Sequence, residues 1–414
     1  MEMAEKKTTS LIESGPGIQS GLKDLRKHLN SKTITTGVVA AIFGVTGPAL
    51  VTIKAATDAG YTEAQTVSWL FGIYVFGGLI SLIMGLYYKM PITGAYSIPG
   101  ASMLGAALVG FSFNEAAGAF MIAGLLVLLL GLSGLMGKVM KWLPLPIVMG
   151  MIGGAMVRFG TNIVNSTVAA PIIGFATLIG FFFIPKAMKK FPPVLGGMIL
   201  GLITAVVTGQ VNFATTEFSF IAPQLVVPSF NVSTILSVSV PLAALVVGAE
   251  NAQAIGVLFA QGYKTPVNAM TIISGIGGIV SGLFGAHNAN IAGPMTAICS
   301  SEESGAKEGR YAATVLNGIL FASFGLIASI AIAFVTTLPS ALINILAGLA
   351  MINVLTNAFK EGFGLNKFRM GAFTALVIAM SGITIIHIGS AFWALVGGVV
   401  VSLVAERKDF DEQN

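Results

Sequence analysis

Long apolar stretches follow one another almost without interruption from residue 33 to residue 405, separated by short polar or charged connections. Unbroken apolar runs are typical of membrane-spanning helices, whereas a membrane β-barrel would show short segments in which apolar and polar residues alternate. The pattern predicts fourteen apolar segments. They lie near residues 33–53, 67–88, 95–109, 116–131, 143–158, 168–185, 193–209, 233–260, 266–284, 288–300, 311–335, 339–358, 369–385 and 388–405.

Several of these segments are too short to cross a bilayer as one straight helix, which needs about 20 residues. The third and the tenth are short and are interrupted by Pro, Gly and small polar residues, at 96–102 and at 287–294. Two segments seven positions apart cross the membrane in opposite directions. We therefore predict an inverted repeat of seven plus seven segments, with broken helices at matched positions.

Composition supports an all-α polytopic membrane protein. Of the 414 residues, 55% are hydrophobic and only 9% are charged, whereas about 25% of an average soluble domain is charged. So few charges could not cover a soluble protein, and the same values exclude a disordered chain. The basic residues are scattered between apolar segments, which argues against nucleic acid as a partner. The single cysteine, Cys299, excludes an intrachain disulfide.

The Lys and Arg residues predict the orientation. When successive connections are assigned to alternate sides, twenty of the 22 fall on one side with both termini, and only Lys54 and Arg158 fall on the other. The larger set includes Lys138, Lys141, Lys189 and Lys190. Because basic connections stay in the cytoplasm, we predict a multi-pass protein of the cytoplasmic (plasma or inner) membrane with cytoplasmic termini. Arg158, at the predicted end of the fifth segment, is expected to anchor at the interface rather than to bind an anion.

The interruptions in segments three and ten predict half-helices that begin inside the membrane. Pro99 suits the first turn of a helix that starts at about Gly100. Asn290 is a candidate N-cap for a second one, with Gly293 and Pro294 in its first turn. Free backbone N–H groups at such N-termini bind anions without a cationic side chain. We predict one anion pocket between the two termini at the bilayer centre; the alternative is a proline kink with close glycine packing.

Glu250 is the one acidic residue in the middle of a predicted span. An ionised carboxyl at that depth costs at least ~2.5 kcal/mol, so Glu250 is a candidate to exchange a proton or to contact substrate; the alternative is a protonated structural carboxyl. Gln253, three residues on, shares its helical face. His287 is a candidate proton shuttle or a structural residue. Phe43 and Tyr96 are candidates to stack on a planar substrate or to pack in the core.

Motifs of known chemistry are absent from the sequence. It contains no HExxH, Walker A or GxSxG motif and no Cys/His cluster with metal-ligand spacing. These absences argue against an enzyme and against a cofactor or metal. Transport driven by an ion gradient, with the proton as the coupling ion, or passive transport is expected.

Several stretches resemble the benzoate:proton symporter family, over roughly residues 30–405. They are Thr36-Gly37-Val38, Thr46-Gly47-Pro48, Tyr96-Ser97-Ile98-Pro99-Gly100, Glu250-Asn251-Ala252-Gln253 and Gly285-Ala286-His287-Asn288. The resemblance implies the fold of nucleobase–cation symporters and sulfate permeases: fourteen segments in two inverted repeats, with short antiparallel strands before the half-helices of segments three and ten. It also implies an elevator-type mechanism and a homodimer through the gate domain.

The same resemblance implies a division of the chain. Cytoplasmic tails at 1–32 and 406–414 flank a core domain (33–142 and 233–338) and a gate domain (143–232 and 339–405). In the nucleobase relatives an acidic residue on span eight contacts the substrate, and Glu250 matches it. Their second acid, on segment ten, is replaced here by Asn288 and Asn290, which favours an anion because a second negative charge would repel it.

We therefore expect proton-coupled import of benzoate or a similar aromatic carboxylate. Glu250 and His287 are the expected proton-coupling residues. The expected substrate-binding residues are Phe43, Tyr96, Ser97, Gly100, Ala101, Ser102, Glu250, Gln253, Asn288, Asn290, Ile291 and Ala292. The alternatives are a nucleobase or inorganic-anion transporter of the same fold and a channel-like anion pathway.

Overall fold

The computed structural model describes residues 12–135, 144–188, 191–211 and 220–411. This part of the chain is almost entirely helical, and each of the fourteen predicted segments contains at least one helix. Among the described residues, six helices are long and apolar enough to cross a membrane, or seven if the pair Lys307–Leu326 and Ala328–Thr336, bent by 64°, is one span. The protein is thus a mostly helical membrane protein, and the fourteen-span repeat stays a prediction.

The elements of the first half end at residue 207. They are α1 (Ile18–His28), α2 (Ser31–Val45), α3 (Gly47–Asp58), α4 (Glu63–Tyr88), β1 (Gly94–Tyr96), α5 (Ile98–Ala107), α6 (Phe113–Ser133), α8 (Leu145–Ala169), α9 (Pro171–Ala187) and α10 (Pro193–Val207). The second half begins with the long span that carries Glu250, and π-helical stretches η1 and η2 interrupt that span. Its elements are α11 (Val232–Thr234), η1 (Ile235–Ser239), α12 (Val240–Leu245), η2 (Val246–Asn251), α13 (Ala252–Ala260), α14 (Val267–Gly282), β2 (Ala289–Ile291), α15 (Gly293–Ser300), η3 (Glu302–Ser304), η4 (Lys307–Gly309), α16 (Tyr311–Leu326), α17 (Ala328–Thr336), α18 (Ser340–Phe363), α19 (Arg369–Ser381), α20 (Ser390–Ala405) and α21 (Arg407–Asp411).

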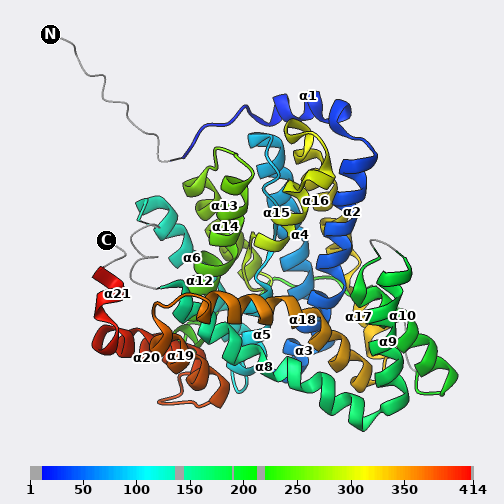
Figure 1. Cartoon of the computed structure of the whole chain (residues 1–414), viewed down its shortest axis with the longest axis vertical. Coiled ribbons are helices and arrows are strands. Elements are labelled where there is room, and N and C mark those ends of the chain that lie inside the picture. Colours follow the sequence, from blue (N-terminus) through cyan, green and yellow to red (C-terminus); the bar gives the residue numbers. More distant parts are fainter. Residues whose placement is uncertain (1–11, 136–143, 189–190, 212–219, 412–414) are drawn as a thin grey trace.

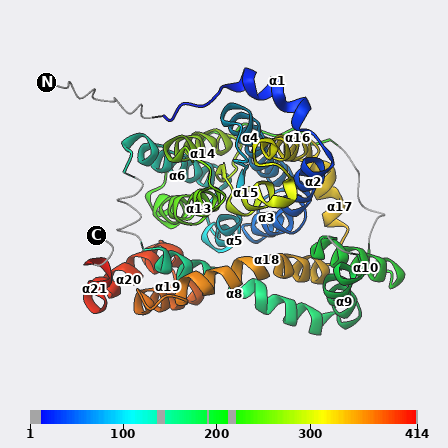
Figure 2. The same ribbon diagram turned by 45° about the horizontal axis from the view of Figure 1, so that its top comes forward.

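The helices gather in two layers (Figure 1, Figure 2). One, here called the gate layer, contains α8, α9, α10, α18, α19 and α20; the other, the core layer, contains α2 to α6 and α13 to α16. In the gate layer α18 and α19 both pack along α8. Helices from both halves of the chain therefore meet within each layer. The division into core and gate domains that move against each other stays a prediction.

The predicted end of the fifth segment, at residue 158, is wrong. Helix α8 continues to Ala169, because the polar residues after Arg158 lower the hydropathy without breaking the helix, and the next proline is Pro171. Arg158 therefore lies inside the helix and not at its edge. Its guanidinium donates to the Ser102 carbonyl of α5, and the interfacial role expected for Arg158 stays a prediction. Four basic residues of the predicted cytoplasmic connections lie outside the described residues: Lys138, Lys141, Lys189 and Lys190.

A two-stranded antiparallel sheet, β1 with β2, lies within the core layer. The pairs are Gly94 with Ile291, Ala95 with Asn290 and Tyr96 with Ala289. Strand backbone in a membrane is tolerated where protein satisfies its polar groups. Serine side chains of the flanking helices do so here: the Ser81 hydroxyl accepts the N–H of Gly94 (2.8 Å) and the Ser274 hydroxyl accepts the N–H of Ile291 (3.0 Å).

Each strand lies directly against a glycine of a long helix. A Cβ on Gly77 of α4 would collide with the backbone of Ala95 in β1, and a Cβ on Gly277 of α14 would collide with the carbonyl of Ala289 in β2. The two halves of the chain thus use the same device at matched positions. Glycine is required at both because backbone, unlike a flexible side chain, cannot move away.

The N-terminal segment is fastened to one end of the core layer (Figure 1). The Glu13 carboxylate accepts the N–H groups of Asn268 and Ala269 at the start of α14. Asp24 of α1 forms an ion pair with Lys89 after α4, and this ammonium holds the pKa of the exposed Asp24 below its usual range.

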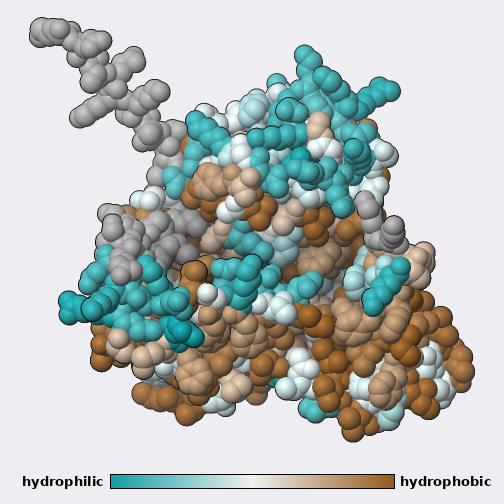
Figure 3. All heavy atoms as spheres, viewed as in Figure 1, coloured by the Kyte–Doolittle hydropathy of each residue, from teal (hydrophilic) through white to brown (hydrophobic). Residues whose placement is uncertain are grey.

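Figure 3 shows hydrophilic atoms gathered over the α1 end of the molecule and hydrophobic atoms over α8, α9 and α10. Many large apolar side chains are exposed in the gate layer, among them Val168, Phe175 and Val207, at 73%, 61% and 81%. Side chains of this kind face lipid in a membrane protein.

Candidate functional site

Glu250 lies where the two half-helices begin. It is carried by the π-helical stretch η2 and is 3% exposed. Its Oε2 accepts the backbone N–H of Gly293, the first residue of α15, at 3.1 Å. The backbone N–H of Ile98, the first residue of α5, also donates to it. One carboxyl group therefore meets the N-termini of both half-helices, each of which carries a partial positive charge.

The two half-helices are capped differently. Ser97 is the N-cap of α5, and its hydroxyl accepts the N–H of Gly100 at 3.0 Å. The N-cap of α15 is Ala292, which has no side-chain acceptor to offer. Glu250, from another helix, supplies the acceptor that Ala292 lacks. The N-termini of the two half-helices, whose free N–H groups favour anions, thus meet a carboxyl group of the protein itself.

Two sequence-based details of these helices are wrong. Helix α5 starts at Ile98 and not near Gly100, because Ser97 caps it one turn earlier. Asn290 is not an N-cap: it lies in β2, where its amide nitrogen donates to the carbonyl of Ile291 at 2.6 Å. The strand keeps the chain extended through Ile291, so α15 begins only at Gly293.

His287 connects α4 to the start of α5. Its Nδ1 accepts the indole N–H of Trp69 at 2.8 Å, and its Nε2 lies 3.0 Å from the carbonyl oxygen of Ser97. An indole N–H only donates and a carbonyl only accepts, so the network assigns the neutral tautomer with the proton on Nε2. Both ring nitrogens are thereby in use.

Tyr96 lies beside this histidine, with the two rings in edge contact at 5.5 Å. Its hydroxyl and that of Tyr74 are 2.9 Å apart, and the Tyr74 hydroxyl donates to the carbonyl of Gly44 at 2.8 Å. Phe43, next to Gly44 on α2, is half-buried against the main core. The network ties α2 to β1 close to the half-helix.

The remaining predicted residues differ in where they lie. Ala101, Ser102, Ile291 and Ala292 are buried on or next to the half-helices. Gln253 is exposed, with its side chain against Gly293. Asn288 points elsewhere: its amide abuts Gly278 of α14, and neither of its amide atoms has a hydrogen-bond partner among the described residues.

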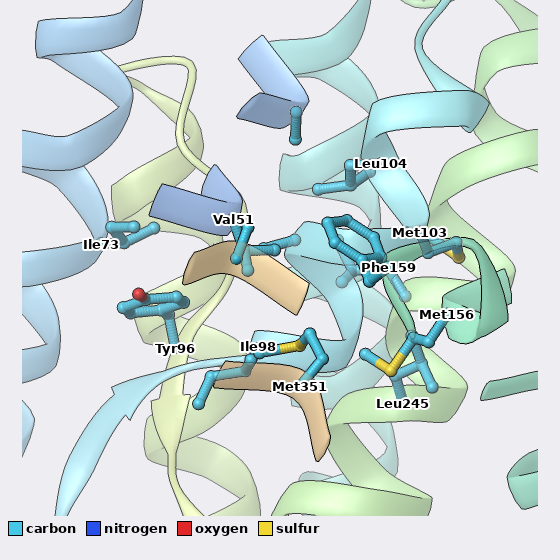
Figure 4. Packing of buried hydrophobic residues seen from close by; sticks show 14 of the residues in the cluster. Val51, Ile73, Tyr96, Ile98, Met103, Leu104, Met156, Phe159, Leu245 and Met351 are labelled. Carbon is cyan, nitrogen blue, oxygen red and sulfur yellow. The ribbon is translucent and has the colours of Figure 1, made fainter. Parts of the chain in front are cut away.

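The far side of α5 faces the gate layer (Figure 4). Ile98 and Met103 of α5 pack there with Met156 and Phe159 of α8 and Met351 of α18. A second contact joins the layers, because Nη2 of Arg158 donates to the carbonyl of Ser102 at 3.1 Å. Within the described ranges no group of three or more His, Cys, Asp or Glu is placed to hold a metal.

Sequence reasoning missed the residues that hold Glu250. The donors, Ile98 and Gly293, act through backbone N–H groups and carry no side-chain signal. Trp69 could have been noticed, because a buried indole N–H in an apolar span needs an acceptor.

Comparisons with known proteins place this chain in a family. A family model described as Benzoate membrane transport protein matches residues 27–404. The inner membrane protein YdcO of Escherichia coli K12 is 31% identical over 387 residues, 91% of this chain and 98% of that protein. The Benzoate membrane transport protein of Acinetobacter baylyi is 24% identical over 387 residues, 92% of this chain and 97% of that protein.

The fold also has a solved counterpart. The transmembrane domain of a cyanobacterial bicarbonate transporter, BicA, superposes with a TM-score of 0.61 at 18% identity, covering 89% of this chain and 97% of that one. This likeness shows the fold. With the match over residues 27–404, the chain belongs to the benzoate membrane transport protein family, whose members are membrane transporters and not enzymes.

Proposed function

We propose that this protein imports benzoate, or a similar aromatic carboxylate, together with protons across the inner membrane. The observation that carries the proposal is the Glu250 carboxyl, held by the first N–H groups of both half-helices. A place that holds one carboxylate by two helix N-termini has the chemistry to hold another. The names of the family and of the Acinetobacter relative support benzoate as the substrate.

Proton coupling follows because Glu250 and the substrate carboxylate compete for the same two backbone N–H groups. When the site is empty, the ionised Glu250 occupies the N–H groups of Ile98 and Gly293. A substrate carboxylate needs the same donors, and two anions side by side would repel each other. Protonation removes the charge of Glu250 and weakens its hold, so that the substrate replaces it. The site then carries one negative charge in either state, which predicts one proton per carboxylate.

Proton coupling is assigned to Glu250 alone, and His287 becomes a positioning residue. A second proton on Nδ1 of His287 would break its bond from Trp69 and leave the indole N–H unpaired. An unsatisfied buried donor costs about 1–3 kcal/mol. The bond from Nε2 to Ser97 instead holds the N-cap of α5 in place.

The substrate ring is proposed to lie against the apolar surface beside α5. Tyr96 lies on the core side, and the methionines Met156 and Met351 lie on the gate side (Figure 4). Phe43, on α2, also belongs to the core layer. Met side chains adapt to irregular apolar ligands. Elevator movement of the core layer against the gate layer would expose this surface to each side in turn, and a homodimer through the gate layer would hold the gate still.

The test is uptake of labelled benzoate into proteoliposomes with an alkaline lumen. Protein-free liposomes are the control, because benzoic acid crosses bilayers unaided. Accumulation should need the protein, should collapse with a protonophore, and should be outcompeted by unlabelled benzoate but not by uracil, sulfate or bicarbonate. Competition by one of those instead would change the substrate, and continuous conductance without accumulation would favour a channel.

Variants test the coupling residue in the same assay. Glu250→Gln should abolish accumulation driven by the proton gradient while retaining benzoate exchange. Glu63→Gln, at the exposed first turn of α4, is the matched control and should leave both activities intact. Normal accumulation by Glu250→Gln would refute the assignment.

A further inference from the structure

A cavity of about 120 Å³ lies between α5 and three helices of the gate layer, α8, α19 and α20. Met103 and Ala107 line it from the half-helix, and Arg158 lines it from α8. Ala379, Thr384 and Ser390 close the far side. The cavity is separate from the Glu250 site, because it lies at the C-terminal end of α5 and Glu250 lies at the N-terminal end.

Arg158 brings a positive charge to this cavity without a carboxylate to balance it. Its guanidinium makes the 3.1 Å bond to the Ser102 carbonyl and lies 5.5 Å from the ring centre of Phe159. The acidic group whose charge acts on it is Asp58. Asp58 is already paired with Lys54 at 2.9 Å, and no ion pair joins it to Arg158 among the described residues. A guanidinium offers five N–H donors in a fork that matches a carboxylate, so Arg158 has donors to spare.

The rest of the lining suits an amphipathic anion. Ser390 and Ala391 are the first residues of α20, whose N-cap, Gly389, has no side-chain cap bond. These N–H groups add donors next to the guanidinium. Met103, Ala107 and Ala379 give the cavity an apolar wall. The combination fits a carboxylate group attached to an apolar body.

The position of the cavity along α5, between the predicted periplasmic side and the Glu250 site, suggests what it does. The Ser102 carbonyl that Arg158 contacts is four residues beyond Ile98, about 6 Å along the helix. The cavity lies toward the side that has few basic residues, which the charge pattern predicts to be the periplasmic side. We propose that this cavity is a waypoint where Arg158 receives the carboxylate of the incoming substrate before it reaches the Glu250 site; the substrate class rests on the proposed function. The arriving carboxylate would bind the guanidinium donors of Arg158 that the Ser102 carbonyl leaves free.

Thiol labelling tests the cavity without using transport as the readout. Thr384→Cys places a thiol in the exposed part of the lining, and Thr208→Cys places one on the same predicted side, exposed at the end of α10. Each is labelled from that side with an anionic (sulfonatoethyl) and a cationic (trimethylammonioethyl) methanethiosulfonate. The unmodified protein gives the background, since Cys299 is buried.

The expected result is an anion preference that depends on Arg158. The ratio of anionic to cationic labelling rates at the Thr384→Cys thiol should fall about tenfold with Arg158→Gln. It should be largely kept with Arg158→Lys, and it should not change at the Thr208→Cys thiol. Benzoate should slow labelling of the Thr384→Cys thiol, and the neutral benzamide should not. Melting temperatures of the purified variants show that each is folded.

Three results would overturn the proposal. An unchanged ratio in folded Arg158→Gln would mean that the cavity has no anion preference. A ratio that depends on Arg158 but no protection by benzoate, in protein that accumulates benzoate in proteoliposomes, would mean that the substrate does not stop there. If benzoate is neither protective nor accumulated, the proposed function fails in the uptake assay and the waypoint fails with it, while an Arg158-dependent ratio would still identify an anion cavity.

Discussion

Glu250→Gln should make benzoate binding independent of pH. In the wild-type protein the Glu250 carboxylate occupies the N–H groups of Ile98 and Gly293, so benzoate displaces it only as Glu250 takes up a proton. One proton linked to one benzoate changes Kd about tenfold per pH unit wherever Glu250 is ionised in the empty protein. Glutamine has no proton to exchange, so this slope should vanish.

The size of the effect at high pH follows from the two hydrogen bonds. A bond to a charged acceptor contributes about 1.5–3 kcal/mol and a neutral one about 1 kcal/mol. Replacing the carboxylate of Glu250 by an amide therefore weakens its hold on the two donors by about 2 kcal/mol in total. Benzoate, which competes for those donors, should bind at least about 30-fold more tightly to the variant once the wild-type Glu250 is fully ionised, and this ratio should rise about tenfold with each further pH unit.

The assay is equilibrium binding of labelled benzoate to purified protein in nanodiscs between about pH 6 and pH 9, a range in which benzoate itself stays ionised. Glu63→Gln should reproduce the wild-type slope. The reasoning is refuted if Glu250→Gln keeps that slope, or if the wild-type protein shows none. Loss of all binding by folded Glu250→Gln would mean that the carboxylate contacts the substrate rather than competing with it.

Three further predictions concern the surroundings of the site. Trp69→Phe removes the donor to His287 and should lower the free energy of unfolding by about 1–3 kcal/mol, measured as a lower melting temperature in detergent. The pH profile of benzoate uptake should stay unchanged. A shifted profile would give His287 a role in proton transfer. Gly277→Val should yield aggregated protein in size-exclusion chromatography, because the new side chain meets strand backbone that cannot move, and a monodisperse, stable product would contradict this. Lys89 lowers the pKa of Asp24, so the stabilisation from this pair is complete above about pH 4 and is lost as the pH falls through the lowered pKa. The hydrogen-exchange protection factors of the α1 amides, in which the intrinsic pH dependence of exchange is divided out, should be steady from neutral pH to about pH 5 and should fall below about pH 4. Asp24→Asn should remove that fall.

The helices could be predicted from the sequence because lipid imposes long apolar runs and the connections between them are short and polar. The boundary at Arg158 failed for the same reason: hydropathy falls there although the helix continues. The strands β1 and β2 are three residues each, too short for any alternation to be visible. They were expected only through the family resemblance.

The parts of the candidate site that consist of side chains could be predicted from the sequence, and the parts that consist of backbone N–H groups could not. Glu250 is conspicuous as an acid in an apolar span. Its partners, Ile98 and Gly293, donate from the main chain, and only the fold brings their N–H groups to one place. Asn290 was misassigned because Asn is favoured at helix starts and depleted in strands, and only the pairing with β1 places it in a strand.

The pairing of β1 with β2 also sets a schedule for biosynthesis. The N–H of Thr93, next to β1, bonds the hydroxyl of Thr296, 203 residues later in the chain. A ribosome adding about 5–20 residues per second needs roughly 10–40 s to deliver that partner. Until then the β1 backbone has no strand beside it, and an unsatisfied backbone group in lipid costs several kcal/mol. The first half of the chain therefore stays incompletely folded in the membrane until β2 is synthesised. A chain whose synthesis stops before β2 would expose the unpaired edge of β1 to quality-control proteases.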